Sequence, residues 1–199
     1  MRGPIDGAPR ENPGGDAGVF LLSLPCPKGD WPSAPRAPKG LTRRFLPFAT
    51  RVQALRIAIA SDHAAVDLKA ELREYLIGLG HEVADLGPAT ADRVDYPDFG
   101  YKLAAVVADG TAECGVALCG SGIGISIAVN RNPALRCALV SEPLSAALAR
   151  EHNDANCIAM GARLTGPDMA KACLDVFLST EFGGGRHAGR VAKLSNPVT

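Results

Sequence analysis

From Leu55 to the end of the chain, short apolar runs alternate with segments in which apolar and polar positions are interleaved. Runs rich in apolar residues over 55–60, 81–86, 114–119, 135–140 and 155–161 predict buried strands. Between them, apolar residues recur every three or four positions, as Leu68, Leu72 and Leu76 do, which is typical of helices. The pattern predicts helices over 64–80, 99–109, 123–131, 143–151 and 166–180, and a short basic helix over 185–194.

Five short strands that alternate with helices indicate an α/β fold. We expect a five-stranded parallel sheet covered on both faces, because each crossover between parallel strands carries a helix. Right-handed crossovers then give a three-layer, doubly wound, Rossmann-like domain. Ligands in such sheets bind beyond the carboxyl ends of the strands. This rule directs attention to residues 61–63, 119–124, 141–142 and 161–163.

Residues 1–53 differ from the rest of the chain. Nine of the 15 prolines lie in residues 1–50, and no helical or strand period is sustained there. We expect a disordered N-terminal extension, or translated sequence upstream of the natural start, followed by a single domain over 54–199. A transit peptide fits less well, because the segment is rich in proline and contains four acidic residues.

Charge and cysteine content narrow the classes of function. Residues 54–199 hold 13 basic and 17 acidic residues, and such a mildly acidic domain binds nucleic acid poorly. No apolar run approaches the ~20 residues that span a membrane, so we expect a soluble protein. Without any C-x-x-C pair, we interpret the cysteines as free thiols of a cytoplasmic protein, with Cys119 set apart by its position. The six are Cys26, Cys114, Cys119, Cys137, Cys157 and Cys173.

The segment 119–124, Cys-Gly-Ser-Gly-Ile-Gly, joins a predicted buried strand to a helix. Its three glycines let a ligand approach the backbone N–H groups. The spacing G-x-G-x-G departs from the dinucleotide fingerprint G-x-G-x-x-G, and it follows the third strand rather than the first. Cys119 immediately precedes a helix N-terminus, whose partial positive charge favours a thiolate, and a thiolate is a competent base. The alternative is one more buried, inert thiol.

Further candidates follow strands and helices. His152 lies at the end of a predicted helix, where the alternative is a helix-end role without chemistry. His63 lies at the start of a predicted helix, where the alternative is that its neighbour Asp62 is simply the N-cap. Arg186 and Arg190 share one face of the last helix, and Arg163 follows the last strand. We expect His81 on the surface. A base, a backbone nest, two histidines and three arginines at one end of one sheet suit proton abstraction beside a carbonyl of a phosphorylated substrate.

Six motifs, in order, resemble the B-type ribose-5-phosphate isomerases and their galactose-6-phosphate isomerase relatives over about residues 55–197. They are IAIASDHAA (57–65), DYPD (95–98), CGSGIGISIAVNR (119–131), HNDAN (152–156), MGAR (160–163) and GRHAGRVAKL (185–194). The resemblance implies an aldose–ketose isomerase that works through a cis-enediolate without metal or cofactor. One branch of the family uses a cysteine as base, and another has a glutamate six residues later. Because Cys119 is present and position 125 is Ile, this sequence resembles the cysteine branch.

The resemblance also implies roles for individual residues. Cys119 matches the base, and His152 matches the residue that opens the sugar ring. The groups that stabilise the enediolate are matched by Ser121 and by the backbone of Gly120, Gly122, Ile123 and Gly124. Asp62, Tyr96 and Asn153 match hydroxyl-binding positions, and His63, Arg163, Arg186 and Arg190 match phosphate-binding ones. Family members are dimers or dimers of dimers with sites built from two chains, so some of these residues serve a neighbour.

The leading hypothesis is interconversion of D-ribose 5-phosphate and D-ribulose 5-phosphate in pentose phosphate metabolism. The same chemistry on a six-carbon phosphate, allose or galactose 6-phosphate, is the close alternative, because the depth of the pocket is not visible in the sequence. A different class of function is a nucleotide-binding α/β module that uses the glycine loop without turnover. We expect neither nucleic acid nor membrane as a partner.

Overall fold

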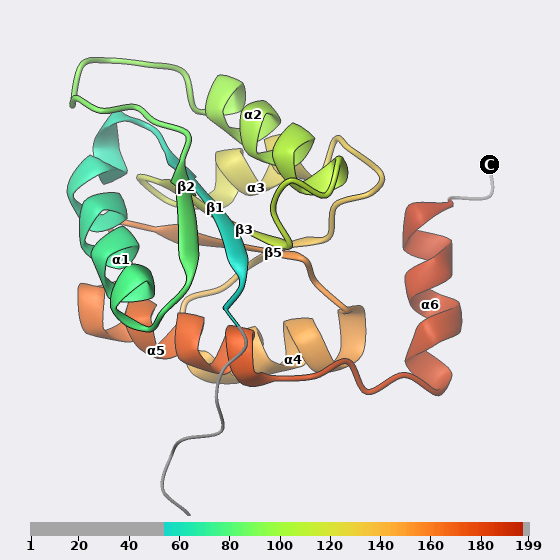
Figure 1. Cartoon of the computed structure of the whole chain (residues 1–199). Helices are drawn as coiled ribbons and strands as arrows, with labels where there is room; N and C mark the ends of the chain where they lie inside the picture. The colour runs from blue at the N-terminus through green and yellow to red at the C-terminus, as the bar shows by residue number, and fades with distance from the viewer. Residues whose placement is uncertain (1–53, 197–199) are drawn as a thin grey trace, which may run out of the picture. The chain divides into compact units, whose positions relative to one another are not determined.

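The computed structural model describes residues 54–196, so the expected N-terminal extension lies outside the described residues. Five strands form one parallel sheet in the order β2-β1-β3-β5-β4. They are β1 (Arg56–Ser61), β2 (Glu82–Asp85), β3 (Cys114–Cys119), β4 (Cys137–Leu139) and β5 (Cys157–Gly161). The predicted α/β fold with five parallel strands is therefore confirmed (Figure 1).

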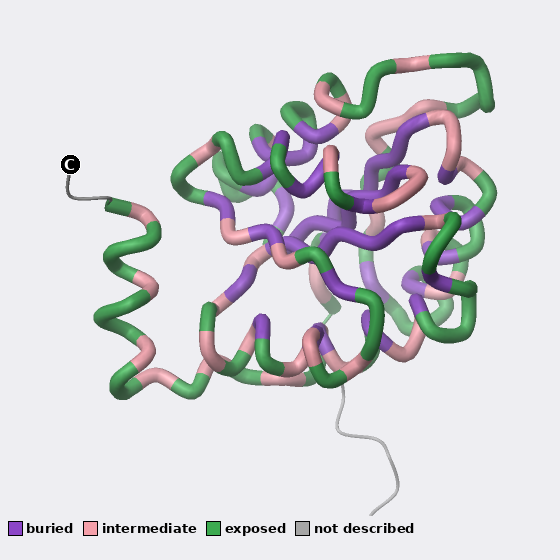
Figure 2. The backbone as a smooth tube through the Cα atoms, turned by 180° about the vertical axis from the view of Figure 1, so that it is seen from behind, coloured by how far each residue is buried: buried purple, intermediate pink, exposed green. Residues whose placement is uncertain are grey.

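Helices cover both faces of this sheet, as the doubly wound prediction requires. Side chains of α1, α4 and α5 pack with one face of the strands, and those of α2 and α3 pack with the other. The helices are η1 (His63–Ala65), α1 (Val66–Gly78), α2 (Tyr96–Ala108), α3 (Ile123–Val129), α4 (Pro143–Asn153), α5 (Pro167–Ser179) and α6 (Arg186–Ser195). Figure 2 shows the strands β1, β3 and β5 almost entirely buried, whereas α6 has no buried residue.

The end of α1 and the start of α2 show how local sequence sets the helix limits. At Gly80, φ is +91°, and its N–H donates to the carbonyl of Ile77, so a left-handed glycine ends α1 as predicted. Helix α2 begins at Tyr96, three residues before the predicted start at 99. Proline is well tolerated in the first turn of a helix, so Pro97 starts α2 rather than belonging to the preceding loop. This correction puts Tyr96 on the first turn of a helix.

His81 is buried, which corrects the prediction that it lies on the surface. Only 6 % of the residue is exposed, and its Nδ1 accepts a hydrogen bond of 3.2 Å from the backbone N–H of Leu55. The contact joins the segments that lead into β1 and β2. Burial lowers the pKa of His81 below its usual value of 6.5, because the charged imidazolium is poorly solvated there.

This burial predicts an acid-sensitive contribution to stability. Because the pKa in the folded state lies below that of the unfolded chain, the stabilisation is present above about pH 6.5 and is lost as the pH falls through the folded-state value. Protonation of Nδ1 would also remove the acceptor for Leu55. We expect the thermal midpoint of the protein to fall more steeply between pH 7.5 and 5.5 than that of His81→Asn, measured by circular dichroism. Parallel curves for the two proteins would contradict this assignment.

No helix within residues 54–196 is both long enough and apolar enough to cross a bilayer.

Candidate active site

The carboxyl ends of β1 and β3 meet where the strand order reverses. From β1 the chain moves outward to β2, and it then returns to the other side of β1 to form β3. A cavity of about 400 Å³ lies at this switch point, where such folds bind ligands. Its lining includes Asp62, His63, Tyr96, Cys119, Gly120, Ser121, Gly124 and Arg163, so eight of the predicted site residues come together.

Cys119 is the last residue of β3 and is almost completely buried, yet it lines this cavity. Its Sγ accepts a hydrogen bond of 3.1 Å from the backbone N–H of Gly122. Gly122 has φ of +76°, and a methyl group on its Cα would lie 2.7 Å from the backbone of Met160, so only glycine fits. The tight turn therefore directs a backbone N–H group at the sulfur.

The residues after Cys119 supply polar groups at the start of α3. The Oγ of Ser121 accepts a hydrogen bond of 3.3 Å from the N–H of Ile123. The first N–H groups of a helix have no partner within the helix, and they favour a negatively charged ligand. A hydroxyl and backbone donors therefore lie beside the sulfur, where an enediolate oxygen would carry charge.

Asp62 and His63 follow β1 at the other side of the cavity. One carboxylate oxygen of Asp62, Oδ1, caps η1 by accepting from the N–H of Ala64 at 2.9 Å, so the N-cap role considered from the sequence is confirmed. The second oxygen is left for a ligand. His63 places Nδ1 3.1 Å from the carbonyl oxygen of Val94, and this contact fixes the ring through one nitrogen. Its Nε2 is then the nitrogen available for a ligand.

Arg163 follows β5 and lies across the glycine loop. Its N–H donates to the carbonyl of Gly120 at 3.0 Å. A methyl group at Gly120 would lie 3.3 Å from the Cζ of Arg163, so the missing side chain lets the guanidinium pack against the loop. Arg163 is exposed at the edge of the cavity, where its planar, charged group is suited to a phosphate.

Four predicted site residues lie elsewhere in this chain: His152, Asn153, Arg186 and Arg190. Helix α4 follows β4 and runs back to the amino ends of the strands, so His152 and Asn153 lie at the edge opposite Cys119. Strand β3 has six residues, which separates the two edges by roughly 17 Å. The prediction that two histidines and three arginines share one end of one sheet is therefore wrong for a single chain. A sugar phosphate cannot bridge that distance.

Three of these residues, His152, Arg186 and Arg190, nevertheless lie near one another around His187. The ring of His187 stacks on that of His152, with 4.4 Å between centroids and 3° between planes. The N–H of Gly183 donates to the carbonyl of Glu151 at 2.9 Å and fixes the start of α6 against the end of α4. The pKa of His187 is lower than its usual value. The largest cause is the partial loss of solvent around the ring, and the positive charges of His152, Arg186 and Arg190 add to it. His187 was not among the predicted site residues, although it lies between two of them, Arg186 and Arg190, in the sequence.

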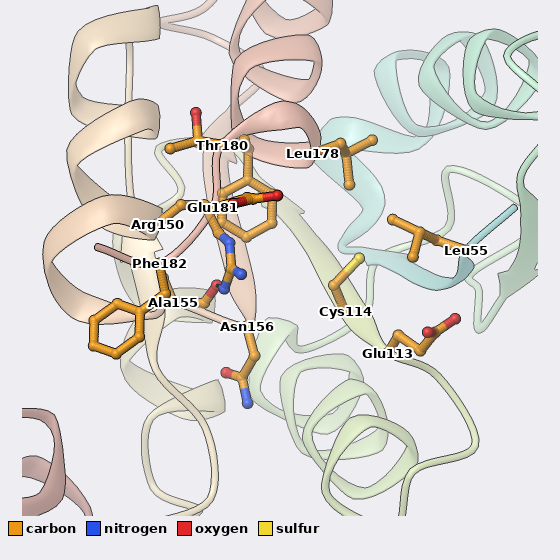
Figure 3. Close-up of a pocket in the computed structure, with 11 residues that line it drawn as sticks. Leu55, Glu113, Cys114, Arg150, Ala155, Asn156, Leu178, Thr180, Glu181 and Phe182 are labelled. Atoms are coloured by element: carbon orange, nitrogen blue, oxygen red, sulfur yellow. Dashed lines mark hydrogen bonds between the residues drawn. The ribbon is translucent and has the colours of Figure 1, made fainter. Parts of the chain in front are cut away.

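A second cavity, of about 360 Å³, lies near the amino ends of β1 and β3 (Figure 3). It contains Cys114, but burial raises the pKa of that thiol to about 12, so it stays protonated. The Arg150 guanidinium donates to Asp154 and to the carbonyl of Ala155, which ties it to the end of α4. The thiol of Cys114 is therefore not a base comparable to Cys119. Within residues 54–196, no cluster of three or more His, Cys, Asp or Glu side chains is arranged to hold a metal ion.

Known proteins are similar to this chain in sequence and in fold. A family model described as Ribose/Galactose Isomerase matches residues 57–194. Ribose-5-phosphate isomerase B of Escherichia coli K12 is 41 % identical over 140 residues, covering 70 % of this chain and 94 % of that protein. D-erythrulose-4-phosphate isomerase of Pectobacterium atrosepticum is 41 % identical over 141 residues, covering 70 % and 93 %. The crystal structure of a ribose 5-phosphate isomerase from Thermotoga maritima is similar with a TM-score of 0.70 and 46 % identity, covering 71 % and 97 %.

The chain belongs to the ribose/galactose isomerase family. It is a sugar-phosphate isomerase of the aldose–ketose type, and the resemblance inferred from the six motifs is confirmed. The family match begins at residue 57, so residues 1–56 lie outside it.

Proposed function

We propose that this enzyme interconverts D-ribose 5-phosphate and D-ribulose 5-phosphate, with Cys119 as the base. The observation that carries the proposal is the Cys119 sulfur, which lines a cavity and accepts the N–H of Gly122 at 3.1 Å. Polar groups for the remainder of a phosphosugar, from Asp62, His63 and Arg163, line the same cavity. Relatives in the same family that are named ribose-5-phosphate isomerase add support.

The reaction moves one proton between two carbons. The Cys119 thiolate takes the proton from C2 of the open-chain aldose. The C2–H electron pair forms a C1–C2 double bond, and the π pair of the C1 carbonyl moves onto O1 to give a cis-enediolate. Ser121 and the N–H groups at the start of α3 stabilise its negative oxygen. The protonated thiol then returns the proton to C1, while the hydroxyl proton passes from O2 to O1. The sulfur ends as the thiolate with which it began, so the cycle is closed.

Recognition is divided between the two ends of the substrate. Asp62 and Tyr96 bind hydroxyl groups, and His63 and Arg163 bind the phosphate, since all four line the cavity that contains Cys119. Asn153 adds a hydroxyl contact, and Arg186 and Arg190 complete the phosphate site. His152 opens the furanose ring by proton transfer. Asn153, Arg186, Arg190 and His152 lie away from Cys119 of their own chain, near the amino ends of the strands. Each site therefore uses these four residues from a second copy of the chain.

Exposed apolar residues beside the cavity support a homodimer. Ile123, Leu139 and Leu164 are 52 %, 45 % and 72 % exposed, and all three line a hollow next to the cavity. Helix α6 has no buried residue in one chain, although it carries Val191 and Leu194. An apolar patch of this kind marks a protein interface. A second copy on this face would bring its own histidine and arginines toward Cys119, in a dimer or a dimer of dimers.

The domain limits and the cellular location belong to the same proposal. We take residues 54–199 as the isomerase domain and residues 1–53 as an extension of it. The five cysteines of the described residues are free and buried, which suits a reducing compartment, and we propose the cytoplasm.

An isomerase assay tests the substrate. The full chain, treated with a chelator and given no nucleotide, is assayed on four-, five- and six-carbon aldose phosphates. We expect the largest kcat/KM for ribose 5-phosphate. A larger value for allose or galactose 6-phosphate would replace the substrate and keep the chemistry, and no turnover of any of them would favour a binding module.

A further inference from the structure

The ring of Tyr96 occupies space that only a glycine at position 124 leaves free. A methyl group at Gly124 would lie 2.6 Å from Cζ of Tyr96, 2.7 Å from Cε2 and 3.1 Å from Cε1. Real side chains do not approach so closely, so any other residue at position 124 would force the ring to move. Both residues line the cavity that contains Cys119. From this contact we infer that Gly124 is a positioning residue, which seats the phenol ring of Tyr96 as one wall of the active site.

The contact between the Tyr96 ring and Gly124 depends on how closely α2 and α3 cross. Tyr96 is the first residue of α2, and Gly124 is the second residue of α3. One turn further along α2, a methyl group at Gly100 would lie 2.8 Å from the Cβ of Ala128 and 3.3 Å from the carbonyl of Ile125. Two glycines, one on each helix, therefore allow the approach. Gly100 allows α2 and α3 to pack closely, and Gly124 leaves the space that the Tyr96 ring occupies.

The two glycines differ in what a side chain would meet. At Gly100 the obstacles are a buried methyl group and backbone, which cannot move without a shift of the helices. At Gly124 the obstacle is the far end of a side chain that is 41 % exposed, so the ring can swing aside. A substitution at position 124 should therefore leave the fold intact and alter the cavity.

This inference rests on the proposed function, because it assigns the ring to the wall of that substrate site. A displacement of about 1 Å in a positioning group can lower a rate ~100-fold. A wall that contacts substrate in the ground state and the transition state alike acts mainly through KM. Gly124→Ala should therefore raise KM for ribose 5-phosphate more than it lowers kcat.

A double-mutant cycle with Gly124→Ala and Tyr96→Ala tests the assignment. We expect each single variant to lower kcat/KM about 10- to 100-fold and the double variant to be no worse than Tyr96→Ala. Tyr96→Phe, which keeps the ring, should restore the sensitivity to Gly124→Ala. Thermal midpoints are measured in parallel. Gly78→Ala, on an exposed helix position where a methyl group meets nothing within 4 Å, is the matched control and should keep wild-type kinetics.

Three results would overturn the inference: wild-type kinetics in Gly124→Ala, a full further loss when Gly124→Ala is added to Tyr96→Ala, or a fall in the thermal midpoint of Gly124→Ala as large as that of Gly100→Ala. The second would mean that position 124 acts through its own backbone, and the third that it serves the fold. Failure of the proposed function is distinguishable, because the wild type itself would then not turn over ribose 5-phosphate.

Discussion

Replacement of Cys119 by alanine should lower kcat for ribose 5-phosphate by about 10³-fold, since a positioned general base contributes ~10²–10⁴-fold. The sulfur is the group that takes the C2 proton in the proposed mechanism, and alanine cannot accept it. The fold should persist, because the substitution removes one atom from a residue at the edge of a cavity and leaves β3 unchanged. Steady-state kinetics and thermal denaturation of the same samples measure the two effects.

Cys114→Ala is the matched control for this prediction. It removes the same atom from the other end of the same strand, where the thiol is buried and protonated. We expect Cys114→Ala to retain wild-type turnover. Cys119→Ser should be as inactive as Cys119→Ala, because a serine hydroxyl is a much weaker acid than a thiol and is not ionised at neutral pH. Near-normal turnover in either Cys119 variant would remove the base assignment.

Two inactive variants should regain activity when their chains are mixed. Cys119→Ala chains are expected to keep about 0.1 % of wild-type turnover of ribose 5-phosphate, and His152→Ala chains about 1 %. In a mixed dimer with shared sites, one site carries both defects and the other carries none. Random pairing makes half of the dimers mixed, so the mixture should recover ~25 % of wild-type activity. The chains are co-expressed with different tags, and the isolated mixed dimer should show ~50 % of wild-type activity, because one of its two sites is intact.

The position of His152 is what makes this experiment decisive. Within one chain, His152 lies near the amino ends of the strands, and Cys119 lies at a carboxyl end, roughly 17 Å away. If each site belonged to a single chain, the mixed dimer would contain two damaged sites and would be no more active than its parents. A mixture of Cys119→Ala with Cys119→Ser is the control, because its mixed dimers have no intact base under either arrangement.

Much of the fold was predictable because its signals are local. Strand β3 was predicted over its observed limits, since a continuous apolar run that ends at a glycine-rich turn has few alternatives. The end of α1 followed from Gly80, which takes the left-handed conformation that most other residues avoid. The eight residues around Cys119 were predictable for a related reason. Seven of them end or follow a strand at the switch point of the sheet, so the topology alone brings them together. Tyr96 was indicated only by the family resemblance, because the pattern placed it in a loop.

The remaining features depend on contacts between distant segments. The burial of His81 depends on a hydrogen bond to Leu55, 26 residues away, and an isolated polar residue before a strand gives no sign of it. The seat of Tyr96 on Gly124 depends on how closely two helices cross. The location of His152 could have been predicted from the order of strands and helices in the sequence, because a helix that joins two parallel strands must run back to their amino ends. Taking that direction into account would have separated His152 from Cys119 at once.

Hydrogen exchange at the reacting carbons tests the central claim most directly. Ribose 5-phosphate is incubated with the full chain in deuterium oxide, without added metal or nucleotide, and followed by NMR. We predict that ribulose 5-phosphate forms with deuterium at C1, that recovered ribose 5-phosphate gains deuterium at C2, and that Cys119→Ala does neither. Exchange and ketose formation at the wild-type rate in Cys119→Ala, or the absence of both with the wild type, would contradict a mechanism in which this sulfur moves the proton.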